Sequence, residues 1–234
     1  MATSRHSVAR FLAISAAQLL ATGIVILYAC RWSGSPAAEV LPLRRVAGGF
    51  VVAWICLLAG VLLLTADVGV LLQRVLPKSE SFRNIEKSIV AGEGSPASAV
   101  AVVVLAGPVL EELLFRGVIL HGFLQSYRRR SAIVMSAALF AVYHVNPWQA
   151  VPAFLMGLLF GYWRAGTGSL WPGIAGHIVA NGVVVAARLR AKPNALEVLP
   201  AIPTSEIAAV GVVAALLLGG GAWALHKARP RGSS

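Results

Sequence analysis

Charged residues are scarce in this 234-residue chain, because Asp, Glu, Lys and Arg make up only 12% of it. That share is about half of what soluble proteins carry. Hydrophobic residues make up 58%. A chain of this length cannot bury so much apolar surface in a single core, which excludes an ordinary soluble domain and predicts that lipid surrounds much of the protein.

Cysteine is also rare, and several catalytic signatures are missing. Cys30 and Cys56 stand alone, with no CxxC or Cys/His spacing, which argues against a disulfide scaffold and a cysteine-based zinc site. The sequence contains no HExxH, no GxSxG and no Ser–Lys spacing. These absences leave no familiar soluble-hydrolase motif to explain the chain.

Acidic residues are fewer than basic ones, and the formal net charge is +11. The Lys and Arg residues gather beside the apolar runs, as in Tyr127–Arg130, Arg188–Lys192 and His226–Arg231. This placement indicates attraction to the anionic headgroups of a lipid bilayer. No basic face with interleaved aromatics is visible, so we expect no nucleic-acid partner.

The most prominent feature of the sequence is its long runs without any charged residue. They are Phe11–Cys30, Val46–Ala66, Gly94–Leu110, Ser131–Trp163, Ala165–Ala187 and Ile207–Leu225. A helix needs about 20 apolar residues to cross a bilayer. The runs predict an all-α, polytopic membrane helix bundle, in which about seven or eight transmembrane helices surround a polar cavity.

We place seven helices along the chain by residue number. Their expected ranges are 11–30, 46–72, 97–126, 131–145, 149–163, 170–188 and 206–226. The chain divides into an N-terminal two-helix region with a linker (1–96), a catalytic core (97–190) and a C-terminal helix with a basic tail (191–234). Within the linker, Glu80–Val90 is expected to form a short interfacial helix.

The fourth and fifth helices come from one apolar run that Pro147 interrupts, because proline disfavours helix in the residue before it and lacks an N–H donor. Each half is about 15 residues, or roughly 22 Å long. Within the second half, "GLLFG" (Gly157–Gly161) has the GxxxG spacing that lets two helix backbones approach closely. We interpret it as a packing motif.

The stretch "AGPVLEELLFRGVIL" places Glu111, Glu112 and Arg116 inside an apolar segment. A charged side chain at the bilayer centre costs at least about 2.5–3.5 kcal/mol. Glu112 and Arg116 are four residues apart on one helix face and can neutralise each other. Glu111 points about 100° away and has no partner in its own helix. A location at the membrane surface, with all three solvated, is the alternative.

Two later segments carry polar side chains of their own. "FAVYH" places His144 at the end of the fourth helix, and "HIVAN" places His177 and Asn181 one turn apart in the sixth. Taken singly, each could serve packing or helix–helix hydrogen bonding. Together with Glu111 they are the groups that a buried hydrolytic site needs, namely a general base, a water-orienting imidazole and oxyanion donors.

These three segments resemble the motifs EExxxR, FxxxH and HxxxN of the CPBP family, which comprises CAAX prenyl endopeptidases, bacteriocin-processing and abortive-infection-type membrane proteases. The resemblance covers about residues 97–188. It implies an eight-helix or similar bundle with a conical cavity, a glutamate mechanism without a cofactor, and a membrane-embedded or lipid-tethered peptide substrate at a bacterial plasma membrane.

The same resemblance implies a role for each motif residue. Glu111 would be the general base with His144 as its partner. His177 and Asn181 would stabilise the oxyanion, and Glu112 and Arg116 would support the site.

Alternatives remain open at this point. Glu111, His144 and His177 could instead hold zinc with an open water position. Intramembrane acids and histidines also mark ion pathways, so a proton-coupled transporter is a second class of function. A non-catalytic membrane scaffold or immunity protein is a third.

Overall fold

The computed structural model describes residues 2–46, 50–80, 100–190 and 203–227. Within these ranges the chain is helical and contains no β-strand. Eight helices are present there when the continuous helical run from Val100 to Ser126 is counted once. The prediction of an all-α membrane helix bundle is therefore confirmed.

Each expected membrane helix has a counterpart in the structure, but α1 begins at Ala2 instead of residue 11, and the short helix α2 was not predicted. The helices are α1 (Ala2–Ser33), α2 (Ala37–Val40), α3 (Val51–Val75), η2 (Val100–Ala106), α6 (Gly107–Glu112), η3 (Leu113–Ile119), α7 (Leu120–Ser126), α8 (Arg129–Tyr143), α9 (Pro147–Thr167), α10 (Trp171–Arg190) and α11 (Thr204–Lys227). The expected interfacial helix Glu80–Val90 falls almost wholly outside the described residues, as does the basic tail after Lys227.

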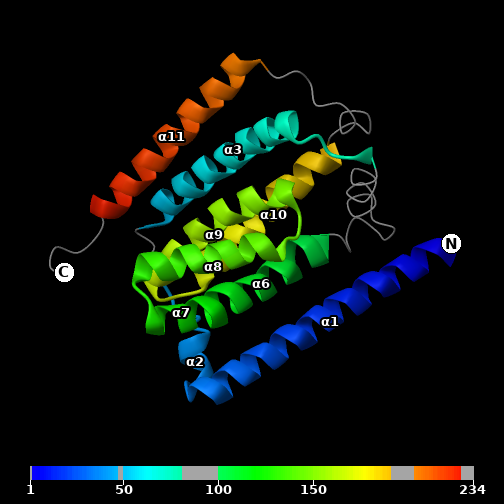
Figure 1. The fold of residues 1–234 in the computed structure, drawn as a ribbon, viewed down its shortest axis with the longest axis vertical. Helices are drawn as coiled ribbons and strands as arrows, with labels where there is room; N and C mark the ends of the chain where they lie inside the picture. The colour runs from blue at the N-terminus through cyan, green and yellow to red at the C-terminus, as the bar shows by residue number, and fades with distance from the viewer. Residues whose placement is uncertain (1, 47–49, 81–99, 191–202, 228–234) are drawn as a thin grey trace.

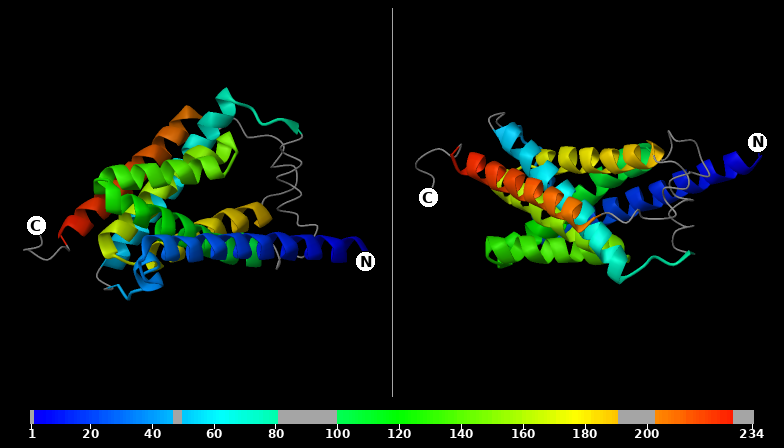
Figure 2. Two further views of the ribbon diagram at one scale, coloured as in Figure 1. Left: turned by 60° about the horizontal axis from the view of Figure 1, so that its bottom comes forward. Right: turned by 90° about the horizontal axis from the view of Figure 1, so that it is seen from above.

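The helices lie side by side in layers (Figures 1 and 2). α11 packs along α3, α3 packs on α9, and α9 packs along α8 and α10. On the other side of the bundle, the long helix α1 crosses α6 and η3. The run from η2 to α7, which carries the acidic motif, is thus enclosed between α1, α8 and α10.

The turn between α8 and α9 forms as proline chemistry predicts. Asn146 is the N-cap of α9, and its side-chain oxygen accepts a hydrogen bond from the Trp148 N–H at 3.0 Å. Pro147 takes the first helical position, where its missing N–H leaves no bond unmade. The split of the apolar run at this point is confirmed.

The predicted end of α9 at residue 163 was wrong. The helix continues to Thr167 and is 21 residues long, because Arg164 is buried by neighbouring elements instead of ending the helix at a membrane surface. It ends at Gly168, whose φ of 67° is the left-handed conformation that glycine adopts most easily. α8 has 15 residues, as expected.

Large apolar side chains cover the outside of the bundle. Leu20, Val52 and Leu216 are 68%, 72% and 70% exposed. In the described part of the chain, three helical segments are long and apolar enough to cross a bilayer, namely Ala16–Ser33, Val51–Val75 and Thr204–Leu225, and Trp171–Ala187 is a shorter apolar helix. Such a surface is suited to lipid rather than to water.

Close packing depends on glycine at two helix contacts. Gly157 of α9 lies so near α8 that a Cβ there would sit 2.9 Å from the Cα of Ala137, which confirms the packing role of the GxxxG motif. Gly221 of α11 meets α3 in the same way, and a Cβ there would sit 2.8 Å from Cγ of Leu57. In a membrane, small residues allow this approach and the van der Waals contact it brings.

We expect Gly221→Val to destabilise the protein by about 1–3 kcal/mol, because the new side chain forces α11 away from α3. Gly220→Val is the matched control, since nothing lies within 4 Å of a Cβ at Gly220. Unfolding temperatures of both variants in detergent test this. Equal losses in the two variants would contradict the α3–α11 contact.

Candidate active site

An ion pair between Glu112 and Arg116 lies at the centre of the bundle. The Arg116 Nη1 donates to Glu112 Oε1 at 2.7 Å, and the two side chains are 1% and 0% exposed. The guanidinium also lies against the Phe140 and Phe160 rings, 4.4 Å and 5.5 Å from their centroids. These aromatic faces stabilise the cation where water is excluded. Burial thereby excludes the alternative in which this pair is solvated.

The backbone around this pair is unusual. η2 and η3 are π-helical segments of seven residues each, and they flank the single α-helical stretch that ends in Glu112. Pro108 has no N–H to donate to the preceding turn, which favours a widened helix there. π-Helical turns are rare and frequently mark functional sites. The sequence analysis did not anticipate them.

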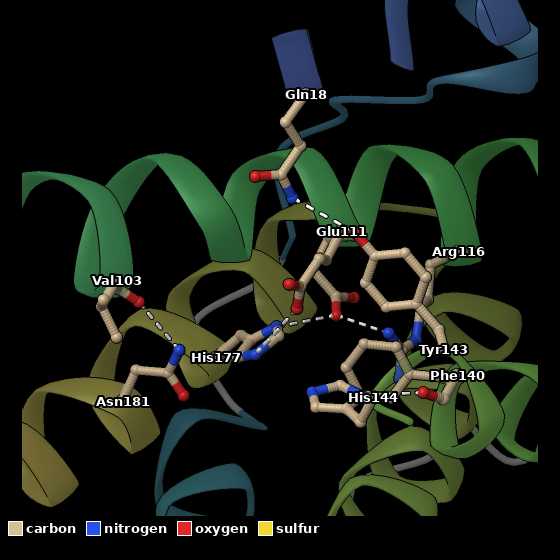
Figure 3. Close-up of polar contacts among 10 residues, drawn as sticks. Gln18, Val103, Glu111, Arg116, Phe140, Tyr143, His144, His177 and Asn181 are labelled. Atoms are coloured by element: carbon tan, nitrogen blue, oxygen red, sulfur yellow. Dashed lines mark hydrogen bonds and ion pairs between the residues drawn. The ribbon is translucent and has the colours of Figure 1, made fainter. Parts of the chain in front are cut away.

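His177 of α10 lies between the two acidic residues (Figure 3). Its Nδ1 is 3.2 Å from Glu112 Oε1, and its Nε2 is 3.7 Å from Glu111 Oε2. Because an ionised carboxylate only accepts, the Nδ1–H of His177 donates to Glu112. Glu112 therefore orients the imidazole so that Nε2 faces Glu111.

Gly173, one turn before His177, allows α10 to come this close. A Cβ on Gly173 would lie 2.6 Å from Glu112 Oε2. Any other residue at this position would therefore displace the Glu112 carboxylate. Gly173 was not predicted as part of the site. It precedes His177 by four residues, and this spacing was the signal that could have indicated it.

Glu111 differs from its neighbour in both exposure and partners. Its side chain is 17% exposed, whereas that of Glu112 is fully buried. Both His177 and His144 lie within electrostatic range of the Glu111 carboxylate. Glu111 thus faces imidazoles from α10 and from the end of α8, as the separation of the two acids on the helix predicted.

His144 follows the last residue of α8 and is oriented by its own helix. Its Nδ1 lies 2.8 Å from the backbone oxygen of Phe140. A carbonyl only accepts, so Nδ1 carries the proton and Nε2 keeps its lone pair. The Phe140 ring packs edge-on against the His144 ring, with centroids 4.7 Å apart, and holds it in place.

Asn181 has a different environment from the other three predicted residues. Its amide Nδ2 donates to the backbone oxygen of Val103 in η2 at 2.9 Å. Figure 3 shows it on the far side of His177 from Arg116 and His144. The structure brings Glu111, His144 and His177 together, and it places Asn181 at the edge of this group with one amide N–H already engaged.

Two further polar residues adjoin the group and were not predicted. Tyr143, next to His144, is within electrostatic range of Glu111, and its hydroxyl accepts from Gln18 Nε2 of α1 at 3.4 Å. Figure 3 shows both beside Glu111. Gln18 lies in a helix without any recognised motif, so the sequence offered no signal for it.

The zinc alternative requires three ligands around one point. Among the residues that the structure describes, no group of three or more His, Cys, Asp or Glu side chains is arranged to hold a metal ion. Both nitrogens of His177 already face carboxylates. We therefore derive no step through a metal.

We expect Arg116→Met to lower the free energy of unfolding by about 3–5 kcal/mol, because it leaves the Glu112 carboxylate buried and uncompensated. The double variant Glu112→Gln, Arg116→Met should recover part of that loss, since no buried charge remains. Denaturant or thermal unfolding in detergent measures both, with the exposed Arg130→Met as control. A single variant as stable as the control would contradict the stabilising role of the pair.

Comparison with known proteins finds two matches to the segment that carries the site. Residues 93–183 match the family described as "Type II CAAX prenyl endopeptidase Rce1-like". A curated protein of Bacillus subtilis (strain 168), named "Putative membrane peptidase YdiL", is 29% identical over 93 residues. That match covers 40% of this chain and 38% of the relative, so the chain spans well under half of the length of the curated protein. No solved structure matches.

The matched segment contains every residue of the three motifs, from Glu111 to Asn181. Both matches agree with the resemblance drawn from those motifs, and they make residues 93–183 similar to this family of membrane endopeptidases.

Proposed function

We propose that this protein is an intramembrane endopeptidase that hydrolyses a peptide bond in a membrane-tethered substrate, with Glu111 activating the water. The observation that carries this proposal is the contrast between two adjacent acids. Glu112 is fully buried and paired with Arg116, whereas Glu111 is partly exposed and faces two imidazoles. The family match and the relative named as a membrane peptidase support it.

In this mechanism Glu111 accepts a proton from a water molecule that also donates to Nε2 of His144. The water oxygen attacks the scissile carbonyl carbon, and the carbonyl oxygen becomes negative. His177, with the free N–H of Asn181, stabilises that oxyanion. Glu111 then returns the proton to the leaving nitrogen as the carbon–nitrogen bond breaks, and the two peptide products separate.

The oxyanion role of His177 depends on Glu112 and Arg116. With Nδ1–H donated to Glu112, the Nε2 atom of His177 donates only when the imidazole is protonated. Arg116 neutralises Glu112 without displacing it, so the pair positions His177 and does not itself react.

The substrate class follows from the surroundings of the site. A lipid-facing bundle would receive a peptide held in the bilayer, such as a prenylated CAAX-type tail, a bacteriocin leader or a C-terminal sorting peptide. We assign the protein to a bacterial plasma membrane as a multi-pass enzyme. Its partners are then the bilayer and this peptide, with no nucleic acid and no cofactor.

Glu111→Gln should reduce cleavage by at least about 10²–10⁴-fold, because the amide cannot accept the proton of the attacking water. Mass spectrometry of membrane-protein C-termini, from cells carrying either form of the protein, would report the lost products. Glu206→Gln, at an exposed acid at the start of α11, is the matched control. Normal processing by a folded Glu111→Gln variant would contradict the proposal.

Chelators should leave cleavage unchanged, because the proposed mechanism uses only protein groups and water. Purified protein treated with 1,10-phenanthroline, dialysed, and assayed with and without added zinc provides the measurement. Loss of activity that zinc restores would overturn the metal-free mechanism while leaving the endopeptidase assignment in place.

A further inference from the structure

A second polar cluster lies at the opposite end of the helices from the α8–α9 turn, where α9 turns into α10. The segment after α2 is fastened there by two hydrogen bonds. Ser169 Oγ donates to the backbone oxygen of Arg44 at 2.7 Å, and the Leu170 N–H donates to the backbone oxygen of Pro42 at 2.9 Å. Arg44 is thereby held against the last turn of α9, which contains Arg164.

Arg164 is buried, and one nitrogen of its guanidinium has no hydrogen-bond partner. Its side chain is 8% exposed, and its Nε is shielded from solvent with no hydrogen-bond partner. Among the residues that the structure describes, no carboxylate forms an ion pair with it, in contrast to Arg116. A buried guanidinium that lacks a counter-charge costs several kcal/mol. An anion from outside the chain would stabilise such a group.

The neighbours of Arg164 add positive charge and donors. The guanidinium of Arg44 lies within electrostatic range of it, and Arg44 is exposed at the surface. The His121 ring of α7 also lies within electrostatic range, and its Nε2 is a second buried nitrogen without a hydrogen-bond partner. Glu39 of α2 is the one acid found near His121 among the described residues, and it is exposed.

We propose that Arg164, Arg44 and His121 bind the phosphate group of an anionic lipid headgroup. Two guanidiniums and an imidazole match a phosphate, which offers several acceptor oxygens and negative charge. The site lies where helices end. Tyr127, just after α7, and Trp171, at the start of α10, are exposed aromatic residues of the kind found at membrane–water interfaces. A headgroup phosphate occupies the same depth.

This site is separate from the proposed catalytic one. Arg164, Arg44 and His121 contact none of the side chains assigned to the hydrolysis of peptide. Its test therefore does not depend on cleavage, and the proposal stands whether or not the endopeptidase assignment does.

The experiment uses the full chain in nanodiscs of phosphatidylcholine, with or without phosphatidylglycerol. We expect phosphatidylglycerol to raise the unfolding temperature of the wild-type protein. Native mass spectrometry should show phosphatidylglycerol retained about tenfold more weakly by Arg44→Gln, because a charge-assisted contact is lost. Arg164→Gln should lose most of the temperature rise.

Arg130→Gln is the matched control, because it removes one positive charge from the same end of the bundle at an exposed residue outside the cluster. It should keep the full effect of the lipid. Should Arg164→Gln fail to fold, the exposed Arg44 variant decides the question by itself. Equal lipid responses in Arg44→Gln and Arg130→Gln would overturn the site.

A second arm separates the two sources of phosphate. Inorganic phosphate is added to the protein in nanodiscs of phosphatidylcholine alone. No change in unfolding temperature supports a lipid headgroup as the ligand. A rise equal to that given by phosphatidylglycerol, absent in Arg44→Gln, would overturn the lipid assignment in favour of a free phosphate.

Discussion

The buried ion pair between Glu112 and Arg116 is the interaction on which the centre of this bundle depends. Neither charge would be tolerated there by itself, because desolvation of a single ion in a low-dielectric interior costs several kcal/mol. The two charges neutralise each other within one helix, aromatic rings cover the guanidinium, and His177 donates to the same carboxylate oxygen as Arg116. Two helices, the run that carries Glu112 and α10, are thereby joined at one oxygen atom, Glu112 Oε1.

The arrangement of these helices gives two adjacent carboxylates different environments. Glu112 serves to orient His177, and Glu111 is left with an open face towards imidazoles. The same chemical group thus has a structural role at one position and an accessible, reactive setting at the next. Arg116 forms its ion pair with Glu112. In the proposed mechanism the Glu111 carboxylate therefore stays available to accept a proton from water.

Packing in lipid supplies the precision that such a site needs. Because hydrophobic burial does not drive helices together in a membrane, close contact depends on small residues. Gly157 brings α9 against α8, and Gly173 brings α10 against Glu112. At one end of the bundle a second arginine, Arg164, is buried with its Nε unpaired. There we propose that a lipid headgroup supplies the negative charge.

The sequence by itself determined which segments are helices, since long charge-free runs can satisfy their backbone only as helices in lipid. It also determined that Glu112 and Arg116 pair, because four residues separate them on one helix. Only the tertiary structure decided that His177 contacts both acids, that Asn181 donates to Val103 and that α9 continues past Arg164. Those outcomes depend on how neighbouring helices are rotated and how closely they approach. Spacing along one chain specifies the face of a helix, but not the neighbour that this face meets.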